Sequence, residues 1–294
     1  MPALERTTAR ATLVLLLFGI VSGTASAAVP DRIVFPVVGR VSFQDDFGAP
    51  RGTGPHEGND IMSKRKAPVV AVERGVAEKH VSSRTGDCML YLYGRSGTEY
   101  VYIHLNNDLT ARNDNEGGCR NGVSWAPGLR ARERVRAGQL VGYAGDSGNA
   151  NGIHPHLHFE LHPNGGAPVT PYPWLERARR VLFAVPAATG AVRLRLRGRF
   201  RSAEGGLAVR VTRVVAVGHW RGSVPPRRVR LLLTGDLVVE RLQDDGHVAP
   251  ATLASASVGE RVTVWTPTFE PTLATQLGRP GALTAKRLRL RGLG

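Results

Sequence analysis

Three histidines alternate with other residues in the segment His154-Pro155-His156-Leu157-His158. Residues two apart in an extended strand point to the same face and lie about 7 Å apart along the strand, so His156 and His158 can share one site. Neutral imidazole is the commonest metal ligand in proteins. We therefore expect one of these two histidines to bind a metal ion and the other to lie beside the reacting water.

A second candidate element is the segment His56-Glu57-Gly58-Asn59-Asp60. The glycine and proline residues within and just before it favour a loop over a helix. In either conformation the side chains of His56 and Asp60 can converge. Two histidines and one carboxylate leave the fourth position of tetrahedral zinc open, which is the ligand pattern of a catalytic site and not of a structural one.

Further short motifs follow the same order as a known family. They are Phe35-Pro36, Phe47-Gly48, His56-x-Gly58-x-Asp60, Tyr102-x-His104-Leu105, Val135-x-Ala137-Gly138-Gln139-x-Val141-Gly142, Gly145-x-Ser147-Gly148 and Pro155-His156-Leu157-His158-Phe159-Glu160. In this order they resemble the lysostaphin-like (LytM-type) zinc metalloendopeptidases, over roughly residues 33–175. The resemblance implies an antiparallel β-sheet peptidase domain that hydrolyses peptide bonds in peptidoglycan stems or cross-bridges.

The resemblance also assigns roles to individual residues. It implies Zn²⁺ as the cofactor, with His56, Asp60 and His158 as the metal ligands. It implies that His104 and His156 are the catalytic residues, on either side of the reacting water and the transition state. One of these two histidines would accept the water proton and pass it to the leaving amine, while the other, protonated, would stabilise the oxyanion.

The chain departs from the family in two places. The segment between Gly148 and His156 is slightly longer than usual, which alters the rim of the site. Some members place a tyrosine ahead of the first motif to help bind the oxyanion, but residues 47–55 contain none, so the catalytic histidines would do that work. Glu160 is expected on the opposite strand face from His158, with a supporting or structural role.

The N-terminus predicts export. Residues 1–27 combine Arg6 and Arg10 with an apolar run from Ala11 to Val21 and the ending Ala25-Ser26-Ala27, which is typical of a secretory signal peptide. The run is too short for a comfortable transmembrane helix. We expect a protein that is secreted, extracellular or in the cell envelope, with no stable membrane span after cleavage. In an oxidising compartment, Cys88 and Cys119 favour a disulfide between two loops.

The pattern of the chain predicts two mainly β domains. Residues 28–178 would form the peptidase domain, with hairpin strands at Met89–Tyr93 and Tyr100–His104 and a helix at Pro173–Leu182. Residues 179–190 would be a linker. Residues 191–294 alternate apolar residues with arginine at both ends and predict a small all-β barrel or sandwich.

Composition limits the remaining classes. The 294 residues are 42% hydrophobic with a net charge of +15, which excludes a multi-span membrane protein and wholesale disorder. Residues 191–294 hold 18 basic and 7 acidic residues, a net charge of +11. Their cationic face is expected either to be simply solvated or to dock on an anionic cell-wall polymer. Nucleic acid is not expected, because the region has few aromatic residues for base stacking and the chain is exported.

One alternative to a peptidase stays open at this stage. The chain could be a non-catalytic protein that binds cell wall or activates another hydrolase. Such proteins usually lose metal ligands, whereas His56, Asp60 and His158 are all present. A zinc measurement on the purified protein separates the two classes.

Overall fold

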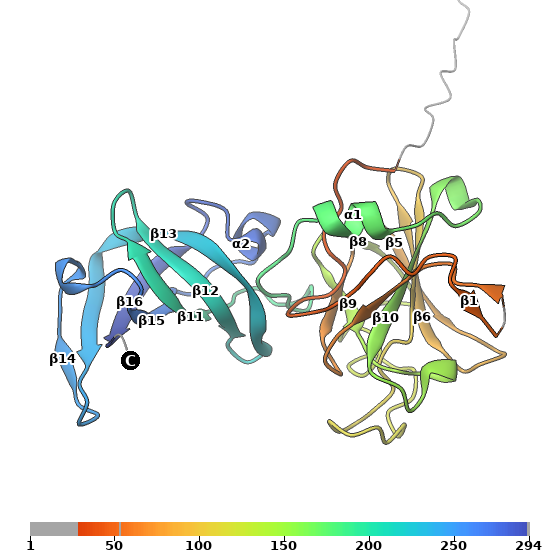
Figure 1. Cartoon of the computed structure of the whole chain (residues 1–294), viewed down its shortest axis with the longest axis horizontal. Coiled ribbons are helices and arrows are strands. Elements are labelled where there is room, and N and C mark those ends of the chain that lie inside the picture. Colours follow the sequence, from red (N-terminus) through yellow and green to blue (C-terminus); the bar gives the residue numbers. More distant parts are fainter. Residues whose placement is uncertain (1–28, 53, 293–294) are drawn as a thin grey trace, which may run out of the picture.

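The computed structural model describes residues 29–52 and 54–292, so the predicted signal peptide, residues 1–27, lies outside the described residues. The fold is mainly β, as predicted, and contains two six-stranded sheets in two lobes along the long axis (Figure 1). Each sheet has its own hydrophobic cluster. Within the described part of the chain, no helix has the length and apolar character needed to cross a membrane.

The first sheet is antiparallel throughout, in the order β3-β10-β7-β6-β5-β8. Its strands are β3 (Asn59–Met62), β5 (Gly75–Val81), β6 (Cys88–Gly94), β7 (Glu99–Ile103), β8 (Arg132–Val135) and β10 (His156–His162). The hairpin of β6 and β7 confirms the strands predicted there. Alternating aromatic and aliphatic residues on these strands, such as Tyr100 and Tyr102, are fully buried and favour extended backbone.

Shorter elements surround this sheet. They are β1 (Pro50–Arg51), β2 (Gly54–Pro55), β4 (Pro68–Val70), β9 (Leu140–Tyr143), the 3₁₀ helices Gly148–Ala150 and Pro163–Gly165, and α1 (Tyr172–Arg177). Helix α1 is shorter than the helix predicted at Pro173–Leu182. The chain leaves the helix because Arg179 pairs with the N-terminal segment, donating to the carbonyl of Ile33 and accepting from the amide of Phe35, both at 3.0 Å.

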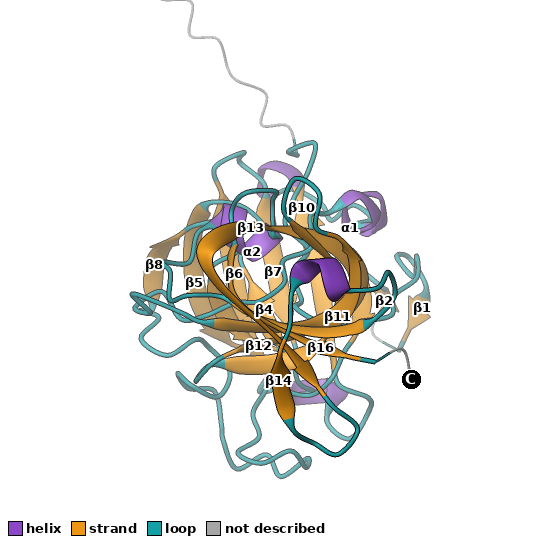
Figure 2. Cartoon of the chain, turned by 90° about the vertical axis from the view of Figure 1, so that its left-hand side faces the viewer, coloured by secondary structure: helices purple, strands orange, loops and turns teal. Residues whose placement is uncertain are grey.

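The second sheet closes on itself to form a barrel. Its strands are β11 (Leu194–Ser202), β12 (Leu207–Ala216), β13 (Trp220–Leu242), β14 (Val248–Pro250), β15 (Arg261–Trp265) and β16 (Thr284–Arg291). Strand β13 is long enough to pair with β12 through its first half and with β16 through its second. The ring β12-β11-β15-β16-β13 is therefore complete, with β14 outside it (Figure 2). Of the two predicted architectures, barrel or sandwich, the strand pairing forms a barrel.

The chain between the two large sheets, after α1 and before β11, is buried over its first half. Residues 181–185 are buried, and the amide of Leu182 donates to the carbonyl of Gln276 at 2.7 Å. Apolar residues of the segment predicted as a linker, residues 179–190, join both hydrophobic clusters. The domain boundaries themselves stay a prediction.

Helix α2 (Leu273–Leu277) connects the two lobes. The barrel also carries the 3₁₀ helix Leu253–Ser255. Leu273 and Leu277 of α2 pack against the cluster of the first lobe, and Gln276 donates from Nε2 to the carbonyl of Gly138 at 2.8 Å. A helix of the C-terminal lobe therefore completes the surface of the N-terminal one.

Candidate metal centre

Three side chains from two strands and one loop converge at the edge of the first sheet. Asp60 on β3 lies directly opposite His158 on β10 in the strand register, and His56 comes from the loop before β3. His56 Nε2 lies 2.8 Å from His158 Nδ1, and Asp60 Oδ1 lies 3.1 Å from each of these nitrogens. All three side chains are largely buried.

Neighbouring groups fix which ring nitrogens face this cluster. His56 Nδ1 lies 2.9 Å from the carbonyl oxygen of Asp46, and His158 Nε2 lies 2.9 Å from Glu160 Oε1. A carbonyl or carboxylate oxygen only accepts, so these nitrogens carry the hydrogens of the neutral rings. In the neutral rings, two nitrogen lone pairs and one carboxylate oxygen face one another, and this arrangement can hold a cation.

The charges around the cluster agree with a cation site. Burial raises the pKa of Asp60, but the hydrogen-bonding rings of His158 and His56 hold that pKa far below its ordinary value. Burial lowers the pKa of His158, but Asp60 and Glu160 raise it to about 9 in the metal-free protein. Asp60 is therefore ionised, and the cluster retains a proton where no metal ion replaces it.

The donor set fits zinc. Zinc is bound in proteins by imidazole nitrogen and carboxylate oxygen at about 2.0–2.2 Å, which puts two ligands of a tetrahedral site roughly 3.3 Å apart. The three separations of 2.8–3.1 Å are within a few tenths of an ångström of that value. Asp60 Oδ2 is already occupied, because it accepts a hydrogen bond of 2.8 Å from Arg51. Only Oδ1 therefore faces the cluster.

Two further histidines lie beside the cluster. His156 Nδ1 donates to the carbonyl of His154 at 2.9 Å, so its Nε2 is left facing Asp60 Oδ1 at 3.8 Å. The rings of His156 and His104 are 4.9 Å apart. Burial is the largest influence on His156 and lowers its pKa, which favours a neutral ring that can accept a proton.

His104 is held in an unusual backbone conformation. Its φ is 59°, in the left-handed region that non-glycine residues seldom adopt and that clusters at functional sites. The amide of Gly145 donates to the carbonyl of His104 at 3.0 Å, and the next residue, Leu105, donates to the carbonyl of Cys88 at 3.0 Å. The turn that ends β7 is thus fixed on both sides.

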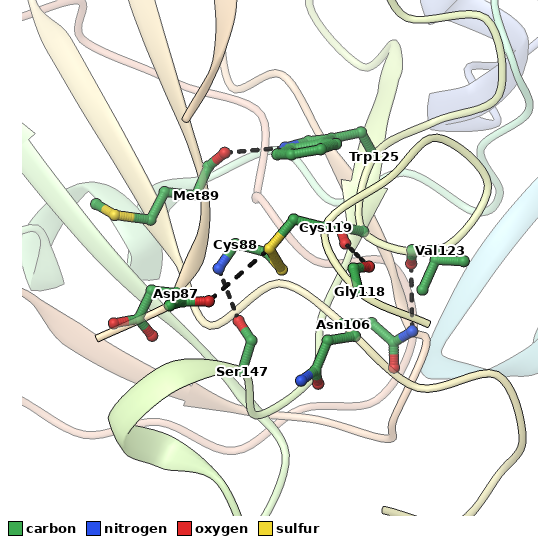
Figure 3. The surroundings of a disulfide bond; sticks show 12 residues. Asp87, Cys88, Met89, Asn106, Gly118, Cys119, Val123, Trp125 and Ser147 are labelled. Carbon is green, nitrogen blue, oxygen red and sulfur yellow. Dashed lines mark hydrogen bonds between the residues drawn. A yellow bond between two sulfur atoms is a disulfide. The ribbon is translucent and has the colours of Figure 1, made fainter. Parts of the chain in front are cut away.

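Asp87 and the disulfide support the ring of His104. His104 Nδ1 lies 2.8 Å from Asp87 Oδ1 and 3.0 Å from the carbonyl of Ser147. The adjacent Cys88 is bonded to Cys119, which confirms the predicted disulfide, and its amide donates to Ser147 Oγ at 3.0 Å (Figure 3). Burial raises the pKa of Asp87, but hydrogen bonds from His104 and Thr85 hold that pKa below its ordinary value.

The five residues singled out from the sequence line a single cleft of about 540 Å³. They are His56, Asp60, His104, His156 and His158. The first histidine of the triple alternation, His154, does not join them: it is exposed and lines a different hollow. Arg51 and Arg84 add positive charge to the wall of the cleft.

The structure places one residue differently from the sequence prediction and adds two residues to the site. The prediction that Glu160 lies on the opposite face of β10 from His158 is wrong, because residues two apart in a strand share a face. It accepts hydrogen bonds from His158 and, at 2.8 Å, from His162. Asp87 and Arg51 were not singled out. Asp87 precedes a cysteine and Arg51 lies between Pro50 and Gly52, so neither residue stands in a motif that carries a chemical signal.

Comparison with known proteins supports the same class. The similarity of this chain to lysostaphin-like (LytM-type) metalloendopeptidases, first seen in the motifs, is confirmed by curated relatives. A protein of Haemophilus influenzae described as an uncharacterized metalloprotease is 32% identical over 115 residues, which are 38% of this chain and 20% of that protein. The L-Ala–D-Glu endopeptidase of Bacillus subtilis is 27% identical over 156 residues, 49% of this chain and 43% of that enzyme.

Solved structures include the catalytic domain of lysostaphin from Staphylococcus simulans. It has 23% sequence identity and a TM-score of 0.35, over 47% of this chain and 92% of that domain. No family model matches the chain. The chain spans less than half the length of the two curated relatives described above.

Proposed function

We propose that this protein is a secreted, zinc-dependent endopeptidase that hydrolyses peptide bonds in peptidoglycan stems or cross-bridges. The observation that carries the proposal is the convergence of three candidate ligand atoms, from His56, Asp60 and His158, with two further histidines beside them in one cleft. The endopeptidase activity of the Bacillus relative supports the substrate class. The predicted signal peptide and the Cys88–Cys119 disulfide support export.

His56, Asp60 and His158 would hold the metal ion. Zinc, when bound, supplies Lewis-acid polarisation of the scissile carbonyl and makes water more acidic. His156 is the general base in this proposal, because its Nδ1 is engaged with a backbone carbonyl and its neutral Nε2 faces the cleft. After accepting the water proton at Nε2, it returns that proton to the leaving amine.

His104 has a different environment and a different role. The Asp87 carboxylate and the Ser147 carbonyl both accept from Nδ1, so they fix the ring orientation and leave Nε2 toward the cleft. When protonated, Nε2 donates a hydrogen bond to the oxygen that gains negative charge in the transition state. Glu160 would act through His158. It accepts a hydrogen bond from Nε2 and so holds the ring with Nδ1 facing the cluster.

A non-catalytic wall-binding or hydrolase-activating protein is not favoured. Such a protein has no need of the ligand set, the neutral His156 or the buried Asp87 that orients His104. The described residues retain all of these groups in hydrogen-bonded positions.

The test combines activity with metal content. Purified protein is incubated with cell-wall sacculi, with added zinc or with a chelator, and new amine ends and released muropeptides are measured by dye labelling and mass spectrometry. The His158→Ala variant should lose stoichiometric zinc and activity. The matched control is His219→Ala, an exposed histidine of the barrel. No new amine ends under any condition, or full activity of His158→Ala, would contradict the proposal.

A further inference from the structure

Five arginines form a continuous row across the outer face of the barrel. In the strand register, Arg228 on β13 pairs with Arg210 on β12, and Arg210 pairs with Arg199 on β11. Arg199 pairs in turn with Arg261 on β15, and Arg261 with Arg291 on β16. All five side chains are exposed. We call these five residues the arginine row.

Such a row opposes folding. Directly opposed residues in neighbouring strands have Cβ atoms about 4.5–5.5 Å apart, and like charges at that distance destabilise the sheet. The row contains four such pairs in succession. Arg197, two residues before Arg199 on β11, is subject to the same repulsion. Burial lowers its pKa most, and the charges of Arg195, Arg213 and Arg291 lower that pKa further. A surface that keeps this arrangement gains from an anion that is not part of the barrel.

Four arginines of the row have no carboxylate partner among the residues that the structure describes. Among the described residues, Arg199, Arg210, Arg228 and Arg291 form no ion pair with a carboxylate, and Arg199 and Arg228 donate only to a backbone carbonyl and a serine hydroxyl. The adjacent arginines differ. Glu240 pairs with Arg287 and Arg289, and Glu260 pairs with Arg241. Ion pairing therefore neutralises one part of the outer face, while those four arginines of the row have no carboxylate partner among the described residues.

The row also borders a hollow. A depression of about 490 Å³ is lined by Arg197 and by four members of the row, Arg199, Arg210, Arg261 and Arg291. Its other lining residues are glycine, proline, valine and threonine. The hollow offers no aromatic ring for stacking and no amide or carboxylate side chain to read sugar hydroxyls. Recognition at this surface is therefore recognition of negative charge.

We propose that the arginine row binds a linear phosphodiester-linked polymer of the cell wall. Planar guanidinium groups match phosphate oxygens with paired hydrogen bonds, and a polymer with phosphates in its backbone presents its charges in succession. At a strand spacing of about 4.8 Å, the four intervals of the row cover roughly 19 Å of surface. Nucleic acid fits less well, because single strands require stacking platforms and Trp265 is already covered by Arg287 and Arg289.

This binding site is on the barrel and is distinct from the cleft with the histidines. It does not depend on the proposed peptidase activity. A protein with an inactive cleft would still bind the polymer, and a protein with a neutralised row would still cleave soluble peptides. The two proposals can therefore fail separately.

The experiment measures binding of the full chain to a fluorescent glycerol phosphate oligomer at low and high salt. The test variant is Arg199→Gln/Arg210→Gln. The matched control is Arg193→Gln/Arg279→Gln, which removes the same charge at exposed positions of the same lobe that are not in the row. The row variant should lose about 10-fold or more in affinity. Its slope of log affinity against log salt concentration should fall by roughly 1.5, while the control changes less than about 2-fold.

Several outcomes would overturn the proposal. Equal losses in the two variants would mean that only net charge matters. Tighter binding of duplex DNA than of the oligomer would identify a nucleic-acid surface, and equal binding of polygalacturonate would show that phosphate is not selected. Absence of binding at about 50 mM salt would exclude the site. Thermal unfolding checks the variants: removing opposed charges should leave the midpoint unchanged or raise it, so lost binding cannot be attributed to unfolding.

Discussion

Replacing Gly58 by alanine tests how closely the loop with His56 passes β10. A Cβ at this position would lie 2.5 Å from the carbonyl oxygen of Phe159 and 2.9 Å from His158 Nε2. Ordinary contacts begin at 3.4 Å, so the loop or the strand must move by about 0.9 Å, more than the roughly 0.5 Å that a functional site tolerates. Gly58→Ala should therefore separate His56 from His158.

Overpacking of this kind costs about 1–3 kcal/mol. If the strain raises the free energy of the metal-bound state, zinc affinity should drop about 5- to 150-fold, since 1.4 kcal/mol is a factor of ten. If the strain destabilises the metal-free protein, its free energy of unfolding should decrease by about 1–3 kcal/mol. The assays are a zinc titration in competition with a coloured chelator and urea unfolding of the metal-free protein.

The matched control lies in the same region of the chain. A Cβ at Gly52 meets nothing within 4 Å, so Gly52→Ala should keep both zinc affinity and stability. If Gly58→Ala bound zinc as tightly as Gly52→Ala and unfolded at the same urea concentration, the account of the metal centre given above would be wrong.

Three other changes have defined outcomes. Glu160→Gln removes the charge that orients His158 and should weaken zinc binding about 10- to 100-fold in the same titration, whereas Glu116→Gln on an exposed loop should not. Asp87→Asn should lower kcat on peptidoglycan fragments about 100-fold with little change in KM. Because Asp87 has a lowered pKa in the folded state, its stabilisation is present above its unfolded pKa of about 3.9 and is lost as pH falls through the folded value. The difference in Tm between wild type and Asp87→Asn should thus shrink on acidification; a constant difference would contradict this. Cys88→Ala/Cys119→Ala opens a loop with a sequence separation of 31 residues and should lower the free energy of unfolding by about 3–4 kcal/mol in denaturant titrations.

The sequence predicted the features that depend on local periodicity. The hairpin of β6 and β7, the arginine alternation of β11 and the shared face of His156 and His158 all follow from the two-residue period of a strand. The same rule places Glu160 on the face of His158, and the expectation of the opposite face misapplied it. All five residues that the motifs predicted for the site line one cleft.

Features set by tertiary contacts could not be predicted in this way. Asp87 supports His104 through a contact across 17 residues, and nothing in its neighbourhood marks it as different from other loop aspartates. Helix α1 stops early because Arg179 pairs with a segment more than 140 residues before it. Closure of the barrel depends on β13 changing partners along its length, which hydropathy alone does not reveal.

The position of α2 has a consequence for how the protein can be divided. Leu273 and Leu277 are encoded near the C-terminus but cover apolar surface of the N-terminal lobe, and Gln276 is bonded to Gly138. Cutting the chain after residue 190 would therefore remove α2 from the N-terminal lobe and expose apolar surface there. The barrel therefore cannot be removed without exposing apolar surface of the N-terminal lobe. If the barrel binds a wall polymer, that polymer would fix the orientation of the cleft relative to the wall. Binding would then limit which bonds the cleft can contact.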